Sequence, residues 1–392
     1  MEMTKFRGER NAKWHQPTAL SGGKVEELQA GLKELGYLPH GEIDGICGYR
    51  TQASIRLFQE YTRIVLGNPT IGASDGIAGS KTFSAIEAAL ANGDRCRWTA
   101  PRREKGRPWP ELLKRAREIV AAQYAAVAPE LLEGSSDTLP PDKWVFDDAP
   151  VHILALRRTS WAASLDNEGR RLNNDVFVVT SQDQDLCFFG STDPDPPRSR
   201  HQLGVPYLCK GQHSYRFGFH RLWDRGAKCY RALRPASSGV RVVRDRDGER
   251  TLLNADRLDA SPNPTINLHW SGRGTTNWSA GCQVVAGAVY LNDEREPVDC
   301  WDSAATSYNG LGGGRGRGAY DVLMSWVTVC SPNITRFGRV PLTLLEERDL
   351  AAIDPELCEA AVDAFATAAR TVASHDRSLQ NLIADRAPHL LA

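Results

Sequence analysis

The sequence predicts an α+β protein of several domains, with a small three-helix domain at the N-terminus, a β-rich central domain and a short helical tail. Apolar residues recur at helical spacing between residues 21 and 92. From Trp144 onward, short apolar runs are separated by turn residues, which is typical of strands. Residues 355–373 return to helical spacing. The length of 392 residues fits two or three domains.

Composition and charge exclude several classes of function. The 48 basic residues balance 48 acidic ones, which argues against nucleic-acid binding, because that needs a basic surplus. No apolar stretch approaches the ~20 residues of a membrane span, so we expect no integral membrane segment. The first 16 residues have no apolar core, so we expect no secretory signal and synthesis in the cytoplasm. The nine cysteines contain no C-x-x-C pair and are expected to be free thiols.

After an N-terminal tail (residues 1–20), the first domain contains an internal repeat. The turn sequence D-G-I-C-G at Asp44 recurs as D-G-I-A-G at Asp75, 31 positions later, and a threonine follows each copy at the same interval. Glycine accepts the positive φ of a tight turn, so each copy predicts a turn. We expect Thr51 and Thr82 to cap the helices that follow. Apolar stripes predict the three helices around Val25–Leu35, Ile55–Phe58 and Phe83–Leu90.

These residues resemble the peptidoglycan-binding domain found on many cell-wall enzymes. The resemblance is carried by residues 25–38 and 43–59 and by the second turn, residues 75–82. It implies that residues 21–92 form a wall-binding domain whose partner is peptidoglycan. Residues 93–143 then predict a connection, in which a basic, proline-broken stretch is followed by one helix over Glu111–Glu133.

The β-rich domain is expected over residues 144–338, and its last predicted strand leads to the candidate chemistry. Apolar runs predict strands at residues 151–156, 176–180, 215–220, 240–244 and 265–269. His269 ends the last of these runs, and Cys282 follows 13 residues later in a Ser-Ala-Gly turn. A nucleophilic thiol needs a neighbouring base, and backbone N–H groups in a turn of small residues can hold a substrate oxyanion. A buried, unreactive cysteine is the alternative interpretation.

The order histidine, then S-x-G-C, resembles the catalytic domain of the L,D-transpeptidases. By position, His269 matches the general base, Ser279 and Gly281 match the turn, and Cys282 matches the nucleophile. The resemblance implies a cofactor-free cysteine enzyme that acts on peptidoglycan stem peptides in the cell wall or periplasm. Because we expect no secretory signal, we expect it to arrive there by lysis or dedicated export. Ala280 stands where the family has histidine. This departure favours hydrolysis over cross-linking.

Four further residues are candidates for substrate binding. Alternation in the run from Tyr215 to His220 puts Arg216 and His220 on one face of a strand, where they could grip a substrate carboxylate. Trp270 and Trp278 flank the motif and could line a groove, although core packing explains either equally well.

Two other functions remain open. His213, His220 and His269 with Asp224 would suit a zinc peptidase, although the H-E-x-x-H motif is missing. Alternatively, the second domain recognises stem peptides without catalysis. Our main interpretation includes no metal site. It ends with a helical segment over residues 339–392.

Overall fold

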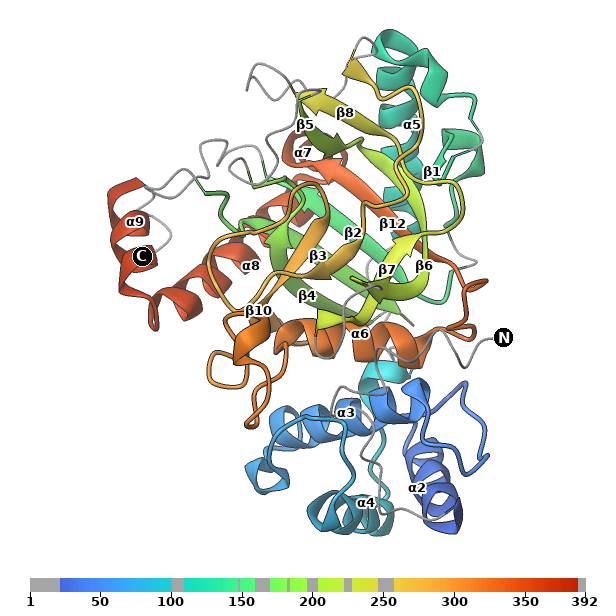
Figure 1. Cartoon of the computed structure of the whole chain (residues 1–392), viewed down its shortest axis with the longest axis vertical. Coiled ribbons are helices and arrows are strands. Elements are labelled where there is room, and N and C mark those ends of the chain that lie inside the picture. Colours follow the sequence, from blue (N-terminus) through green and yellow to red (C-terminus); the bar gives the residue numbers. More distant parts are fainter. Residues whose placement is uncertain are drawn as a thin grey trace.

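The computed structural model shows an α+β protein with a helical N-terminal domain, a β-rich barrel and a helical C-terminal region, as the sequence predicts at this level (Figure 1). The N-terminal helices lie below helix α6, and α8 and α9 lie to the left of the barrel (Figure 1). None of the described helices is long and apolar enough to cross a membrane. The structure describes residues 22–100, 109–134, 136–146, 149–158, 170–181, 184–195, 204–221, 228–245 and 257–386.

The N-terminal domain packs three helices around a leucine-rich core. Leu32 and Leu35 are fully buried, and Phe58 and Ile86 reach them from the other two helices. Gly36 ends the first helix with a φ of 88°, a conformation that favours glycine. The helices are α2 (Gly22–Glu34), α3 (Tyr49–Ile64) and α4 (Ser80–Asn92).

A buried glutamine holds the first of the repeated turns. The Nε2 of Gln29 donates to Asp44 Oδ1 at 2.8 Å and to Thr51 Oγ1 at 3.1 Å. Its Oε1 accepts from the backbone N–H groups of Asp44 and Gly45, both at 3.0 Å. One amide side chain therefore satisfies both the backbone and the polar side chains of the turn.

Gln59 holds the second turn in the same way. Its Oε1 accepts from Gly76 N at 2.9 Å, and its Nε2 donates to Thr82 Oγ1 at 3.2 Å. The prediction that the two threonines cap the helices is therefore wrong. The N-cap positions are Gly48 and Gly79, which have no side chain to donate or accept, and the hydroxyls serve the glutamines instead.

Replacing Gln59 with leucine is expected to lower the free energy of unfolding by about 3 kcal/mol, because it leaves the buried Gly76 N–H and Thr82 hydroxyl without partners. Urea unfolding of the full chain, followed by circular dichroism, measures the loss. Gln380→Leu on exposed α9 is the matched control and should change stability by less than about 0.5 kcal/mol. Equal effects of the two variants would contradict a stabilising role for the hydrogen bonds between Gln59 and the second turn.

The central domain is a curved sheet that closes on itself. Its strand order is β1-β6-β12-β2-β3-β4-β10-β9-β7, and β7 pairs again with β6 to close the ring. β11 pairs with β10, while β5 and β8 form a separate two-stranded sheet. The strands are β1 (Thr138–Leu139), β2 (His152–Arg157), β3 (Asp175–Ser181), β4 (Gln184–Ser191), β5 (Val205–Leu208), β6 (Gly211–His220), β7 (Tyr230–Pro235), β8 (Val242–Asp245), β9 (Leu268–Trp270), β10 (Gln283–Leu291), β11 (Pro297–Asp299) and β12 (Val340–Glu346).

Helices cover two sides of this sheet. On one side, α6 (Ala319–Cys330) shares a single core with the N-terminal domain and with inward side chains such as Phe188 and Leu268. The other side packs against a second core, to which Leu154 and Phe189 contribute. The helices of that second layer are α5 (Trp109–Val127), α7 (Glu347–Ile353) and α8 (Pro355–Ala373), with α9 (Arg377–Arg386) packed on α8.

Two sequence-based boundaries differ from the structure. The helix expected over Glu111–Glu133 ends at Val127, because Pro129 cannot continue it and begins a 3₁₀ turn. The segment expected to be a helical tail from residue 339 begins with β12, which lies between β2 and β6. Every residue of β12 is buried, so its sequence shows no alternation that would mark it as a strand.

Polar contacts fix the N-terminal domain to the barrel. Arg50 Nη1 donates to the carbonyls of Thr328 and Ser331, at 3.2 and 2.7 Å. These carbonyls lie at the C-terminal end of α6, where helical partners are missing. Toward the other end of α3, Tyr290 of β10 donates to Glu60 Oε1 at 2.8 Å. The two domains are therefore joined by specific polar bonds as well as by a shared core.

Candidate functional site

Cys282 lies where two parallel strands begin to pair. β9 and β10 are neighbours, with Gln283 opposite Leu268. The half-buried thiol of Cys282 comes just before β10, and its Sγ accepts from Asn267 N at 3.3 Å and donates to Thr265 O at 3.2 Å. The sulfur therefore contacts the chain that leads into β9, the strand that carries His269.

Ser279 organises the turn before the thiol. Its Oγ accepts from the backbone N–H of Gly281 at 3.3 Å and from that of Cys282 at 2.8 Å. In this structure the two N–H groups expected to hold an oxyanion therefore donate to the Ser279 hydroxyl. A Cβ on Gly281 would lie 2.9 Å from the Pro206 ring, which explains why the turn needs glycine there.

His269 lies in the middle of β9 and is 4% exposed. Its Nδ1 donates to the carbonyl of Trp270 at 2.8 Å, which leaves Nε2 as the nitrogen that can accept a proton. Within the described residues, no hydrogen bond joins this imidazole to the thiol of Cys282. Burial lowers the pKa of His269 to about 4, so the imidazole is neutral at pH 7.

His220, at the end of β6, stacks on His269 with ring centroids 3.8 Å apart and planes inclined by 19°. Its Nδ1 lies 3.4 Å from the side-chain nitrogen of Asn267, the residue whose N–H donates to the thiol. Burial and the neighbouring His269 lower the pKa of His220 to about 2. The structure thus brings two neutral imidazoles together, with Asn267 between His220 and the sulfur.

The thiol is also neutral at pH 7. Burial raises the pKa of Cys282, while the Asn267 N–H, the Ser279 hydroxyl and the charge of Arg234 act in the opposite direction. The resting site therefore holds a thiol and two neutral imidazoles, and not a preformed thiolate–imidazolium pair. A proton must leave the sulfur when a substrate is attacked.

The two candidate tryptophans differ in exposure. Trp270 has no exposed surface and belongs to the core, so it cannot line a groove. Trp278 is half-buried and stacks on Tyr308, with centroids 5.8 Å apart and planes inclined by 8°. Sequence reasoning missed Tyr230, whose hydroxyl lies 3.4 Å from His269 Nδ1. Nothing in the sequence around Tyr230 indicated that its hydroxyl would lie next to His269.

The alternative zinc site is not assembled in the described part of the chain. His213 is fully buried away from the other two histidines, with Thr138 Oγ1 3.0 Å from its Nδ1 and Cys209 O 2.8 Å from its Nε2. Asp224 lies outside the described residues. No group of three metal-ligating side chains occurs among the residues that the structure describes.

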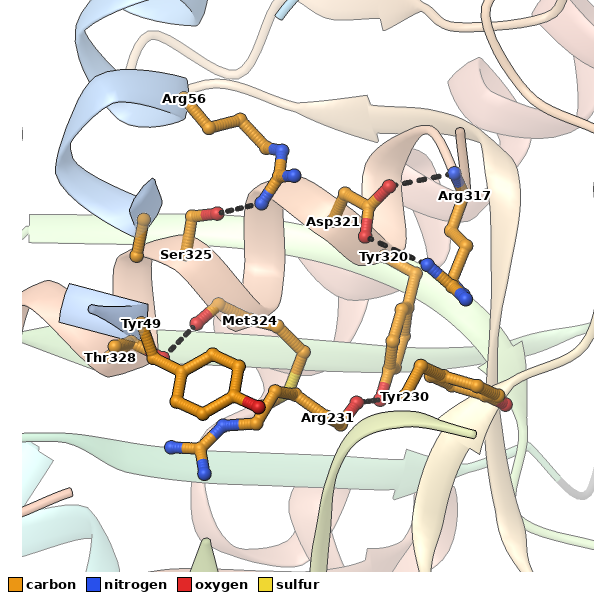
Figure 2. A pocket seen from close by; sticks show the side chains of 11 residues that line it. Tyr49, Arg56, Tyr230, Arg231, Arg317, Tyr320, Asp321, Met324, Ser325 and Thr328 are labelled. Carbon is orange, nitrogen blue, oxygen red and sulfur yellow. Dashed lines mark hydrogen bonds and ion pairs between the residues drawn. The ribbon is translucent and has the colours of Figure 1, made fainter. Parts of the chain in front are cut away.

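A pocket with an empty volume of roughly 360 Å³ lies at the junction of the N-terminal domain and the barrel (Figure 2). Arg56 of α3 donates to Ser325 of α6 at 3.2 Å, and Arg231 of β7 lies 4.6 Å from the ring of Tyr49. Tyr230 also lines this pocket and links it to the histidine pair. Because these contacts join the N-terminal domain to the barrel, we assign the residues that line the pocket a structural role in holding the two domains together.

The comparisons with known proteins identify the first domain. A family model described as a peptidoglycan binding domain matches residues 21–86, which include α2, α3 and the start of α4. Neither the curated proteins nor the solved structures gave a match. The chain therefore contains a peptidoglycan-binding domain at its N-terminus, followed by the barrel that carries Cys282.

Proposed function

We propose that this protein binds peptidoglycan and cleaves its stem peptides with Cys282 as the nucleophile, by the chemistry of the L,D-transpeptidase family. The observation that supports this most is the half-buried thiol that Asn267 links to two neutral imidazoles, in the same chain as a peptidoglycan-binding domain. A buried, inert cysteine needs no such neighbours. The other half-exposed thiol, Cys47, lies in the N-terminal domain and shares none of them.

In the proposed mechanism, substrate binding brings the sulfur and an imidazole together. His269 Nε2 takes the thiol proton as the sulfur attacks a stem-peptide carbonyl carbon. The N–H groups of Gly281 and Cys282 turn from Ser279 Oγ to the oxyanion. The peptide C–N bond then breaks, and the leaving amine takes the proton from the imidazolium. Water attacks the thioacyl group with His269 again as base, which releases a carboxylate and restores the thiol.

Water is the favoured acceptor in this proposal. Ala280 provides no side chain to shape a site for a second stem peptide, and its position in the turn is exposed. An amine acceptor at the same thioacyl group would give cross-linking. The N-terminal domain would keep the barrel on its polymeric substrate, because α3 and α6 hold the two domains together. The site of action in this proposal is the cell wall or periplasm, reached by lysis or dedicated export.

Mass spectrometry of purified peptidoglycan, incubated with the protein, tests the proposal. New free carboxyl ends on stem peptides are expected, and prior alkylation of the protein with iodoacetamide should prevent them. New peptide cross-links would assign transfer instead of hydrolysis. Products that vanish with chelator and persist after alkylation would replace the proposal with a zinc peptidase. Unchanged peptidoglycan, from protein that still sediments with the wall, would leave only a binding protein.

His269→Gln is expected to lower kcat by about 10²- to 10⁴-fold, because the variant lacks the base that takes the thiol proton. His220→Gln is the matched control, since His220 stacks on the base without replacing it, and its loss should be less than about tenfold. Product release from wall fragments measures both rates. A larger loss in His220→Gln than in His269→Gln would show that the base is assigned to the wrong ring.

A further inference from the structure

Four arginines lie around one edge of the site. Arg216 of β6, Arg234 of β7, and Arg336 and Arg339 before β12 form no ion pair within the part of the chain that the structure describes. Other arginines of this chain do have acidic partners, among them Arg63, Arg97, Arg157, Arg244 and Arg295. We call the four residues the arginine cluster.

Strand pairing brings the cluster together. Arg216 and Arg234 are direct partners across β6 and β7, a relation that puts Cβ atoms about 5 Å apart on one face. Arg339 comes directly before β12. The first residue of that strand, Val340, pairs with Tyr215, the neighbour of Arg216. A Cβ on Gly218 would lie 2.9 Å from Arg234 Cδ, so the stem of Arg234 crosses this glycine. Gly218 lies on the same strand as His220, between it and Arg216.

Arg234 also connects the cluster to the thiol. It follows Leu233, whose partner is Leu268 of β9, so Arg234 lies beside Asn267. Asn267 in turn donates its backbone N–H to Cys282 Sγ. The charge of Arg234 acts to lower the pKa of Cys282 and the pKa of His220, as expected for a guanidinium close to both.

The cluster concentrates positive charge at this edge of the site. Burial and the charges of Arg234, Arg339 and Arg336 lower the pKa of Arg216, because like charges repel. Asp137 acts in the opposite direction, but it forms no ion pair with an arginine among the described residues, and its carboxylate accepts from the backbone N–H groups of Ser237 and Gly239. An anion on the cluster would relieve this repulsion and gain charge-assisted hydrogen bonds.

We propose that the arginine cluster binds a carboxylate of the peptide substrate, close to the bond that Cys282 attacks. This inference rests on the proposed function and names its substrate class, an acidic peptide. Phe337 is 64% exposed between Arg336 and Arg339 and offers an apolar surface that suits a peptide better than a bare phosphate. β7 and β10 are two strand spacings apart, about 10 Å, so the carboxylate belongs within about three residues of the scissile bond.

Alkylation of Cys282 with a charged and a neutral reagent tests the cluster without any need for turnover. Iodoacetate carries a carboxylate and iodoacetamide does not, and both react with the same thiolate, so their rate ratio cancels changes in thiol pKa. Arg234→Gln is expected to lower the iodoacetate-to-iodoacetamide ratio at Cys282 by about threefold or more. Arg377→Gln, which removes a charge from exposed α9, is the matched control. An unchanged ratio in Arg234→Gln would overturn the proposal.

Protection experiments identify the ligand. A stem tetrapeptide with free carboxylates is expected to slow the reaction of Cys282 with iodoacetamide, about tenfold more effectively than its fully amidated form, and Arg234→Gln should remove the difference. Equal protection by both peptides would overturn the carboxylate assignment. Stronger protection by inorganic phosphate would assign a phosphate-bearing ligand instead. Selective protection without any wall cleavage would retain the carboxylate site while the proposed enzyme activity fails.

Discussion

Cys282→Ala is expected to lower the rate of stem-peptide release at least about 10³-fold, because the proposed mechanism routes every turnover through a bond to this sulfur. Serine at this position should rescue little, since a hydroxyl beside neutral imidazoles is a far weaker nucleophile than a thiol. The measurement is the initial rate of new carboxyl ends, determined by mass spectrometry on purified peptidoglycan.

Two controls keep this result specific. Cys47→Ala removes the other half-exposed thiol, in the N-terminal domain, and should leave the rate unchanged. Both variants should sediment with the wall like the parent protein, because the peptidoglycan-binding domain lies outside the barrel. Full activity in Cys282→Ala would end the cysteine mechanism, and joint loss of sedimentation and activity would point to a folding defect instead.

The first domain could be predicted from the sequence because its signals are local. The helical stripes and the doubled turn lie within about 70 residues, and each turn depends on glycines that are visible in the chain. The glutamine clamps were not predicted. Gln29 and Gln59 stand at equivalent places before the two turns, but only the fold shows that each side chain bends back onto a turn 15 to 17 residues later.

The barrel could be predicted only in part because its pairings are long-range. Five of the twelve described strands were expected near their observed places, and seven were not. Among the seven is β12, and no pattern indicated that it joins β2 to β6. Strands buried on both faces lose the alternation that distinguishes them from buried helices. The ring closes through the pairing of β6 with β7, and nothing in the sequence indicated that these two strands pair.

For the candidate site, the sequence supplied residue types and the structure supplied neighbours. The motif singled out Cys282 and His269, and the alternation around Arg216 and His220 agrees with their exposure. The roles of Asn267 and Arg234 depend on which strand ends meet, so no local pattern could indicate them. Trp270 and Trp278 look equivalent in the sequence, but the fold buries Trp270 completely and leaves Trp278 half-buried.

Acid is expected to destabilise the protein strongly because its barrel buries neutral histidines. His152 and His213 are 4% and 0% exposed, and burial lowers the pKa of each to about 3. In the unfolded chain a histidine has a pKa of about 6.5, so between these values the unfolded state binds more protons than the folded state. Stability is therefore complete above about pH 6.5 and falls as the pH decreases.

The expected loss is about 3 kcal/mol per histidine at pH 4, relative to neutral pH, from these two pKa values. Two such residues together remove a large part of the 5–15 kcal/mol that typically stabilises a domain. At His213 the hydrogen bonds fit the neutral ring: Nε2 donates to Cys209 O, and Nδ1 accepts from the Thr138 hydroxyl. A second proton on Nδ1 would force the Thr138 hydroxyl to turn from donor to acceptor, while its oxygen also accepts from Arg241 N.

Urea unfolding between pH 7.5 and pH 4 measures this dependence as a slope of unfolding free energy against pH. His213→Gln should reduce the slope by up to about 1.4 kcal/mol per pH unit, which corresponds to one proton fewer taken up on unfolding. We expect this even if the variant is less stable at neutral pH. Gln380→Leu alters an exposed side chain of α9 that binds no proton and should leave the slope unchanged. Identical slopes in all three proteins would show that acid acts elsewhere, because a histidine that titrates equally in both states contributes no pH dependence.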